Sequence, residues 1–240
     1  VAVVAFGLQI PMLCECQRAK ARAEQAAVIE SGRARIRDAM RKTAGLSTRM
    51  MGYTFDRLTP RPGQEKAYKL MRDYANVFYD GLDKGVILSG ATGSGKTMLA
   101  AAVANKVIDT TYIDEYTAEQ VWRHGIPPER SPVRMISTVD LMAQIKDRYD
   151  TGGAQDLIRI YQTPRLTILD DVGAEKPTDW VIERLMEIID YRYREMLPLI
   201  ITTNQSPKEM QARLGARIWD RLCEMCAQIV IYAPSQRRAI

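Results

Sequence analysis

The 240-residue chain is predicted to fold as an α/β protein, with a parallel sheet flanked by helices and a basic helical segment before it. From residue 85 onward, short apolar runs alternate with longer amphipathic ones, and a glycine-rich turn joins the first run to the first helix. Such alternation of strands and helices favours a parallel sheet with helices on both faces. The length permits one globular domain plus an appendage.

The basic segment comes first. Residues 1–49 contain nine Lys or Arg against four Asp or Glu, which leaves 25 of each kind in the remaining chain. This balance fits contact with nucleic acid or with an acidic protein face, and it fits a solvated polar helix face equally well. Residues 17–49 are rich in Ala, Arg and Glu and predict one or two exposed amphipathic helices, interrupted at Gly32 and Gly45.

Turn-forming residues between positions 51 and 64 mark a boundary, so we predict a segment of residues 1–50 and a domain of residues 51–240. The apolar start of the chain is shorter than the roughly 20 residues of a membrane span, and it lacks the pattern of a signal peptide. No membrane segment is therefore predicted. The first residue is not Met, which indicates a fragment or a trimmed chain. The four cysteines suit a reducing, cytoplasmic location.

The expected elements follow in order along the chain. Apolar runs predict strands at residues 85–90, 133–138, 166–171 and 197–204. Helical periodicity predicts helices at residues 66–81, 97–109, 139–150, 180–196 and 217–226. The stretch between Asp109 and Pro132 is expected to be an inserted loop or small helix.

The glycine-rich turn carries the strongest chemical signal. "GATGSGKT" fits G-x-x-x-x-G-K-[ST], and it stands after a predicted strand and at the start of a predicted helix. Such a loop cradles phosphates with its backbone N–H groups and the helix N-terminus. Lys96 would reach the β- and γ-phosphates, and the Thr97 hydroxyl would hold Mg²⁺. The predicted nucleotide-binding residues are Gly90, Ala91, Thr92, Gly93, Ser94, Gly95, Lys96, Thr97 and Met98.

Polar residues at two later strand ends complete a predicted site. Asp170 is placed to hold the metal, and Asp171 to orient or deprotonate the attacking water. Two adjacent acids also suit a helix cap or turn, but the phosphate loop favours the catalytic interpretation. Asn204 can hold the attacking water or a γ-phosphate oxygen, although Thr-Asn at a strand end is also common turn chemistry.

The stretch "RIWDRLCEMC" predicts an amphipathic helix. Arg217 and Arg221 lie on its polar face, whereas Cys226 lies on the packed face with Cys223 at the edge. A zinc site is therefore disfavoured, and Cys226 is interpreted as a small buried hydrophobe. Arg221 suggests an arginine finger for a neighbouring subunit, with salt bridges inside the same helix as the alternative.

These motifs, with "LIITTN" and "PSQRR", resemble the AAA+ helicase loaders of the DnaC/DnaI type over residues 50–240. They are equally similar to the IstB transposition ATPases. The resemblance implies Walker A residues Lys96 and Thr97, Walker B residues Asp170 and Asp171, sensor 1 Asn204, a trans-acting finger Arg221 and a sensor 2 Arg237. It also places Tyr53 and Phe55 near the adenine.

The chain departs from the family pattern at two places. The Cys14-x-Cys16 pair lacks the preceding cysteine pair of the DnaI-type zinc region, and two thiolates do not fill a tetrahedral zinc site, so zinc is not expected. The segment between Asp109 and Pro132 is longer than the usual family connection. A smaller difference is Gln236, where the family usually has Tyr.

The resemblance implies an ATPase that uses ATP and Mg²⁺, self-associates through its ATP sites, and loads a hexameric replicative helicase onto single-stranded DNA. Lys146 and Arg148 are candidates for DNA backbone contact, or else part of an exposed helix face. The alternatives are a transposition helper that acts on duplex DNA with a transposase, and an interaction module with an inert ATPase.

Overall fold

The computed structural model describes residues 2–5, 8–11, 14–125, 130–149, 151–175 and 178–234. The chain packs as two compact units: residues 1–39 with 112–129, and residues 40–111 with 130–240. The domain boundary after residue 50 stays a prediction, because packing groups the elements differently from chain order. Within the described ranges, no helix is both long and apolar enough to cross a membrane.

The larger unit is built on a parallel sheet with the strand order β4-β5-β6-β3-β7. Its strands are β3 (Gly85–Gly90), β4 (Val133–Ser137), β5 (Leu166–Asp170), β6 (Leu199–Thr203) and β7 (Cys226–Ile231). Ser137 is in register with Asp170, and Ser89 with Thr203. The polar residues that follow these strands therefore meet at one edge of the sheet. The predicted parallel sheet is confirmed.

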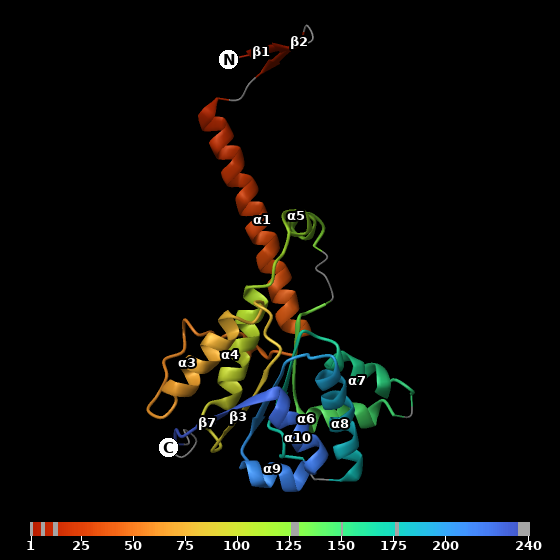
Figure 1. Ribbon diagram of the computed structural model, residues 1–240. Coiled ribbons are helices and arrows are strands. Elements are labelled where there is room, and N and C mark those ends of the chain that lie inside the picture. Colours follow the sequence, from red (N-terminus) through yellow and green to blue (C-terminus); the bar gives the residue numbers. More distant parts are fainter. Residues whose placement is uncertain are drawn as a thin grey trace. The chain divides into compact units, whose positions relative to one another are not determined.

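Helices cover both faces of this sheet, with α3 and α4 on one side and α8 and α10 on the other (Figure 1). Strand residues alternate between the faces: Ile87, Leu169 and Ile201 join a buried cluster with α6 to α10. The helices are α2 (Thr48–Met51), α3 (Glu65–Asn76), α4 (Lys96–Asp109), α6 (Thr138–Asp147), α7 (Ala154–Gln162), α8 (Asp179–Arg194), α9 (Pro207–Leu214) and α10 (Ala216–Met225).

The elements α7, α9 and β7 of this unit were not predicted. Ser206 and Glu209 form a capping box that starts α9. β7 was missed because Cys226 is both the C-cap of α10 and the first residue of the strand, with no turn residue between them. The predicted helix 66–81 ends at Asn76.

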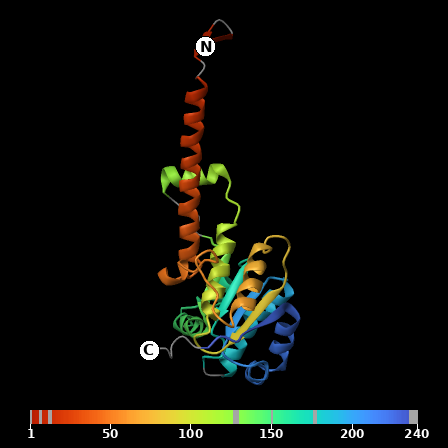
Figure 2. The same cartoon turned by 90° about the vertical axis from the view of Figure 1, so that its left-hand side faces the viewer.

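The smaller unit contains the hairpin β1 (Ala2–Ala5) and β2 (Leu8–Pro11), most of α1 (Glu15–Thr43), and α5 (Glu115–His124). Helix α1 is unbroken through Gly32, so the predicted interruption is wrong (Figure 2). A Cβ atom at Gly32 would lie 1.9 Å from the carbonyl oxygen of Ala118, and the glycine thus permits α5 to cross α1. The predicted inserted segment contains a helix packed on α1.

Candidate functional site

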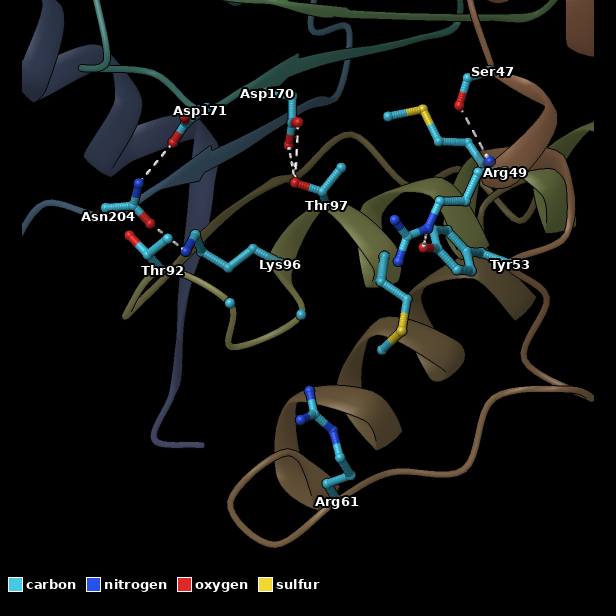
Figure 3. Close-up of a pocket in the computed structure, with 14 residues that line it drawn as sticks. Ser47, Arg49, Tyr53, Arg61, Thr92, Lys96, Thr97, Asp170, Asp171 and Asn204 are labelled. Atoms are coloured by element: carbon cyan, nitrogen blue, oxygen red, sulfur yellow. Dashed lines mark hydrogen bonds between the residues drawn. The ribbon is translucent and has the colours of Figure 1, made fainter. Parts of the chain in front are cut away.

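A pocket of ≈ 470 Å³ opens at the carboxyl edge of the sheet, where the predicted phosphate loop, Asp170, Asp171 and Asn204 come together (Figure 3). Four chain regions far apart in sequence form its walls. The lining residues are Ser47, Arg49, Met50, Tyr53, Arg61, Thr92, Gly93, Gly95, Lys96, Thr97, Met98, Asp170, Asp171 and Asn204.

The phosphate loop leads into the N-terminus of α4 beside this pocket. Gly95 is the N-cap of α4 with φ of 100°, a conformation that strains any other residue, and no side chain caps the helix there. The first N–H groups of α4 have no partner within the helix and suit an anion. The buried amide of Gln64 donates to the carbonyl of Ser94 at 2.5 Å and fixes the loop from α3's side.

The ammonium group of Lys96 lies inside the loop. Its side chain is buried, and Nζ donates to the carbonyls of Gly90 at 2.8 Å and Ala91 at 3.0 Å. It also donates to Oδ1 of Asn204 at 2.5 Å. This places one positive charge next to the N-terminus of α4, where a phosphate group would receive both contributions.

Asp170 ends β5 as a buried carboxylate. The hydroxyl of Thr97 donates to both of its oxygens at 3.0 Å, and Thr202 Oγ1 donates to Oδ1 at 2.6 Å. Burial raises the pKa of Asp170, and the hydrogen bonds from Thr202 and Thr97 lower it in part. A hydroxyl and a carboxylate oxygen in contact are hard donors that suit Mg²⁺, so Thr97 and Asp170 fit the predicted metal.

Asp171 has a strained backbone, with φ of 56°. Its N–H donates to Thr202 Oγ1 at 2.8 Å, and its Oδ1 accepts from Nδ2 of Asn204 at 2.8 Å. The Asn204 amide therefore bridges Lys96 and Asp171, as the dashed lines in Figure 3 show. The three predicted side chains form one hydrogen-bonded group at the pocket floor.

The other wall contains residues that the motifs did not identify. Ser47, Arg49, Met50 and Arg61 line the pocket together with Tyr53, whose hydroxyl accepts from Arg49 Nε at 2.6 Å. Tyr53 was predicted to lie near the adenine. Phe55, predicted there too, is buried and packs edge-on against Tyr68, outside this lining.

Asn105 fixes this second wall from inside α4. It is fully buried, and its Nδ2 donates to the carbonyls of Met50 at 2.9 Å and Tyr53 at 2.8 Å. Its Oδ1 accepts from Arg41 Nε at 3.0 Å. The sequence analysis missed this residue, although an asparagine within the apolar run "LAAAVANKVI" is a signal that could have found it.

Arg221 lies outside the pocket lining. Nη2 of Arg221 is 2.7 Å from Asp190 Oδ1, and its guanidinium lies 5.6 Å from the ring centroid of Tyr193. A role in a neighbouring subunit stays a prediction. Arg237 falls outside the described residues.

Cys226 is buried in the core, as predicted, and burial raises its pKa to about 12. Cys223 is exposed. The Cys-x-x-Cys pair is therefore divided between the interior and the surface.

Comparison with known families agrees with this geometry. The model of the IstB-like ATP binding proteins matches residues 37–239, which is most of the chain. The chain belongs to this IstB-like family. Its phosphate loop and pocket accordingly make it an ATP-binding P-loop protein.

Two curated relatives of this IstB-like chain are replicative helicase loaders. DnaC of Escherichia coli is 26% identical over 162 residues, covering 67% of this chain and 58% of DnaC. DnaI of Bacillus subtilis is 23% identical over 203 residues, covering 78% of this chain and 59% of DnaI. The chain thus spans less than two thirds of the length of these relatives.

Another relative is described as an ATP-binding protein in an insertion sequence of Mycobacterium tuberculosis; it is 25% identical over 173 residues, covering 70% of this chain and 61% of the relative.

Solved structures confirm the predicted AAA+ fold. A crystal structure of the DnaC helicase loader superposes with a TM-score of 0.62 at 26% identity, covering 77% of this chain and 99% of that one. DnaA from Aquifex aeolicus bound to AMPPCP superposes with a TM-score of 0.57 at 18% identity, covering 75% of this chain and 50% of that one. At that identity the DnaA likeness concerns the fold.

Proposed function

We propose that the chain hydrolyses ATP and uses the cycle to load a replicative DNA helicase onto single-stranded DNA. The observation that carries the ATPase proposal is the arrangement at the pocket floor, where Lys96, Asp171 and Asn204 form one hydrogen-bonded group beside the phosphate loop. The similarity to DnaC in both sequence and structure supports the loader role.

Each side chain has a distinct task in this proposal. The α4 N-terminus and Lys96 bind the triphosphate and neutralise charge on its terminal phosphate. Thr97 and Asp170 would hold Mg²⁺, which supplies charge neutralisation at the phosphates. Asp171 accepts a proton from the attacking water or orients it, and Asn204 fixes the Asp171 carboxylate through its amide.

Arg221 completes the site of a neighbouring subunit in this proposal. Its pairing with Asp190 joins two partly exposed side chains, at 21% and 26% exposure. Binding a partner's triphosphate would exchange this ion pair for contacts with the γ-phosphate. Arg237 would read the γ-phosphate from the C-terminal end, as the family resemblance implies.

The far end of α6 is the proposed DNA contact. Lys146 lies 5.1 Å from the ring centroid of Trp180, and the same surface depression includes the exposed ring of Tyr149. Arg148 is exposed beside it. Cationic groups next to accessible aromatic rings suit the phosphates and unstacked bases of a single strand.

A transposition helper that acts on duplex DNA with a transposase is the second candidate. The IstB-like family match and the relative from an insertion sequence favour it. It would use the same ATP site and a different macromolecular partner.

A loading assay separates the two candidates. The full chain is mixed with the replicative helicase of its host and a single-stranded circular DNA, and helicase retained on the DNA is measured with and without ATP. We expect at least a fivefold ATP-dependent gain, about 1 kcal/mol, and loss of that gain in Lys96→Ala. No gain, together with tighter binding to a duplex than to a single-stranded oligonucleotide, would favour the transposition helper.

A further inference from the structure

The turn after β5 contains a buried carboxylate that the proposed hydrolysis does not use. Glu175 is 9% exposed, and its Oε2 lies 2.7 Å from the hydroxyl of Thr138, which is completely buried. Both Glu175 oxygens also accept from the N–H of Gly173, at 3.2 and 3.1 Å. The hydrogen bond between Thr138 and Glu175 is short and buried, so breaking it is costly, because the Glu175 carboxylate would lose the Thr138 hydroxyl as a donor.

Thr138 connects that carboxylate to Asp171. Its Oγ1 is 3.2 Å from the carbonyl oxygen of Asp171 and 2.7 Å from Glu175 Oε2. A hydroxyl has one hydrogen, and it faces two acceptors here. The hydrogen is shared between them: the closer Glu175 Oε2 takes the stronger bond and fixes the position of Thr138, and the Asp171 carbonyl takes the weaker one.

Asp171 needs such support because its backbone is strained. The left-handed φ of 56° costs a non-glycine residue free energy and persists only where neighbours hold it. Thr202 holds the Asp171 N–H from β6, at 2.8 Å, while Thr138 and Ala174 N–H meet its carbonyl from the other side, at 3.2 and 3.1 Å. The peptide groups on both sides of the Asp171 Cα atom are thus fixed by partners from different elements.

We propose that Thr138 and Glu175 are positioning residues for ATP hydrolysis, which hold Asp171 in the backbone conformation that directs its carboxylate at Asn204 and the attacking water. The inference rests on the proposed ATPase activity. Neither residue is in the pocket lining, so they act through Asp171 and not on the nucleotide. Thr138 is the first residue of α6 and directly follows Ser137, the last residue of β4. Ser137 pairs with Asp170 on β5, so Thr138 lies next to Asp171 and can contact its carbonyl.

The test measures turnover at saturating ATP and the affinity for AMPPCP in the full chain. Thr138→Val and Glu175→Ala are each expected to lower turnover about tenfold or more, because a small misplacement of a catalytic group costs rate. The AMPPCP affinity should stay within about threefold. Thr138→Ser restores the hydroxyl and should restore turnover to within about threefold of the wild type.

Two further measurements exclude a general structural effect. The double variant should lose about as much turnover as the more impaired single variant, because each substitution removes the same hydrogen bond between Thr138 and Glu175. Thr163→Val is the matched control: its exposed hydroxyl bonds only to its own helix, at the carbonyl of Arg159, and its loss should leave turnover unchanged. If Glu175→Ala does not fold, Glu175→Leu keeps much of the side-chain volume and should still lower turnover more than about threefold, since it has no oxygen to accept from Thr138 or Gly173.

Single variants with turnover within twofold of the wild type, or losses that multiply in the double variant, would overturn this inference alone. A wild-type chain that binds AMPPCP tightly but does not hydrolyse ATP, alone or with DNA, would overturn the proposed ATPase and this inference together.

Discussion

The substitution Asn105→Ala tests whether one buried amide holds the second wall of the nucleotide pocket. It removes three hydrogen bonds, to the carbonyls of Met50 and Tyr53 and from Arg41, at 2.8 to 3.0 Å. At about 1 kcal/mol each, the free energy of unfolding should fall by about 3 kcal/mol. For a chain of this size that lowers the unfolding midpoint by about 9 °C.

Nucleotide binding should weaken as well. Binding would then have to order Met50 and Tyr53, at a cost of about 1–3 kcal/mol in total, which predicts a loss of about tenfold in ATP affinity. Urea unfolding and titration with a fluorescent ATP analogue measure the two effects. Asn76→Ala is the control, since Asn76 is exposed at the end of α3 and its loss should change stability by less than about 0.5 kcal/mol. A variant as stable as this control, or one with unchanged ATP affinity, would refute the reasoning.

Three other predictions concern the site and the core. Lys96→Ala should abolish ATP binding, because the pocket loses its buried ammonium group; undiminished affinity in a filter-binding assay would remove the P-loop argument. Arg221→Ala should bind ATP but not hydrolyse it. Mixing this variant with Asp171→Asn should recover activity, because some interfaces then combine the intact Asp171 of one variant with the intact Arg221 of the other; no recovery would count against a shared site. At pH 8, a thiol reagent should label Cys14, Cys16 and Cys223 but spare Cys226 until unfolding, because burial raises the pKa of Cys226 to about 12 and excludes the reagent; four reactive thiols in the folded chain would contradict the burial.

The sequence predicted those parts of the site whose chemistry depends on local spacing. The phosphate loop was recognisable because a strand, glycines, a lysine and a helix must follow one another along the chain. Asp170, Asp171 and Asn204 were identified because parallel strands bring their carboxyl ends to one edge.

The missed residues act through contacts distant in sequence. Gln64 reaches Ser94 across 30 residues, and Asn105 reaches Met50 across 55, so no local pattern indicates either partner. Glycine at position 32 was interpreted by its helix propensity, whereas tertiary packing decides its role. The strand β7 was missed for a different reason, because no turn residue separates it from α10.

The crossing at Gly32 also constrains how this chain can vary. A methyl group at that position would collide with the backbone of α5, and no change of side chain at Ala118 relieves the collision, because the atom in the way is a carbonyl oxygen. Position 32 therefore favours glycine for as long as α5 crosses α1 there. In a relative without the insertion the restriction disappears, and alanine there would make a better helix.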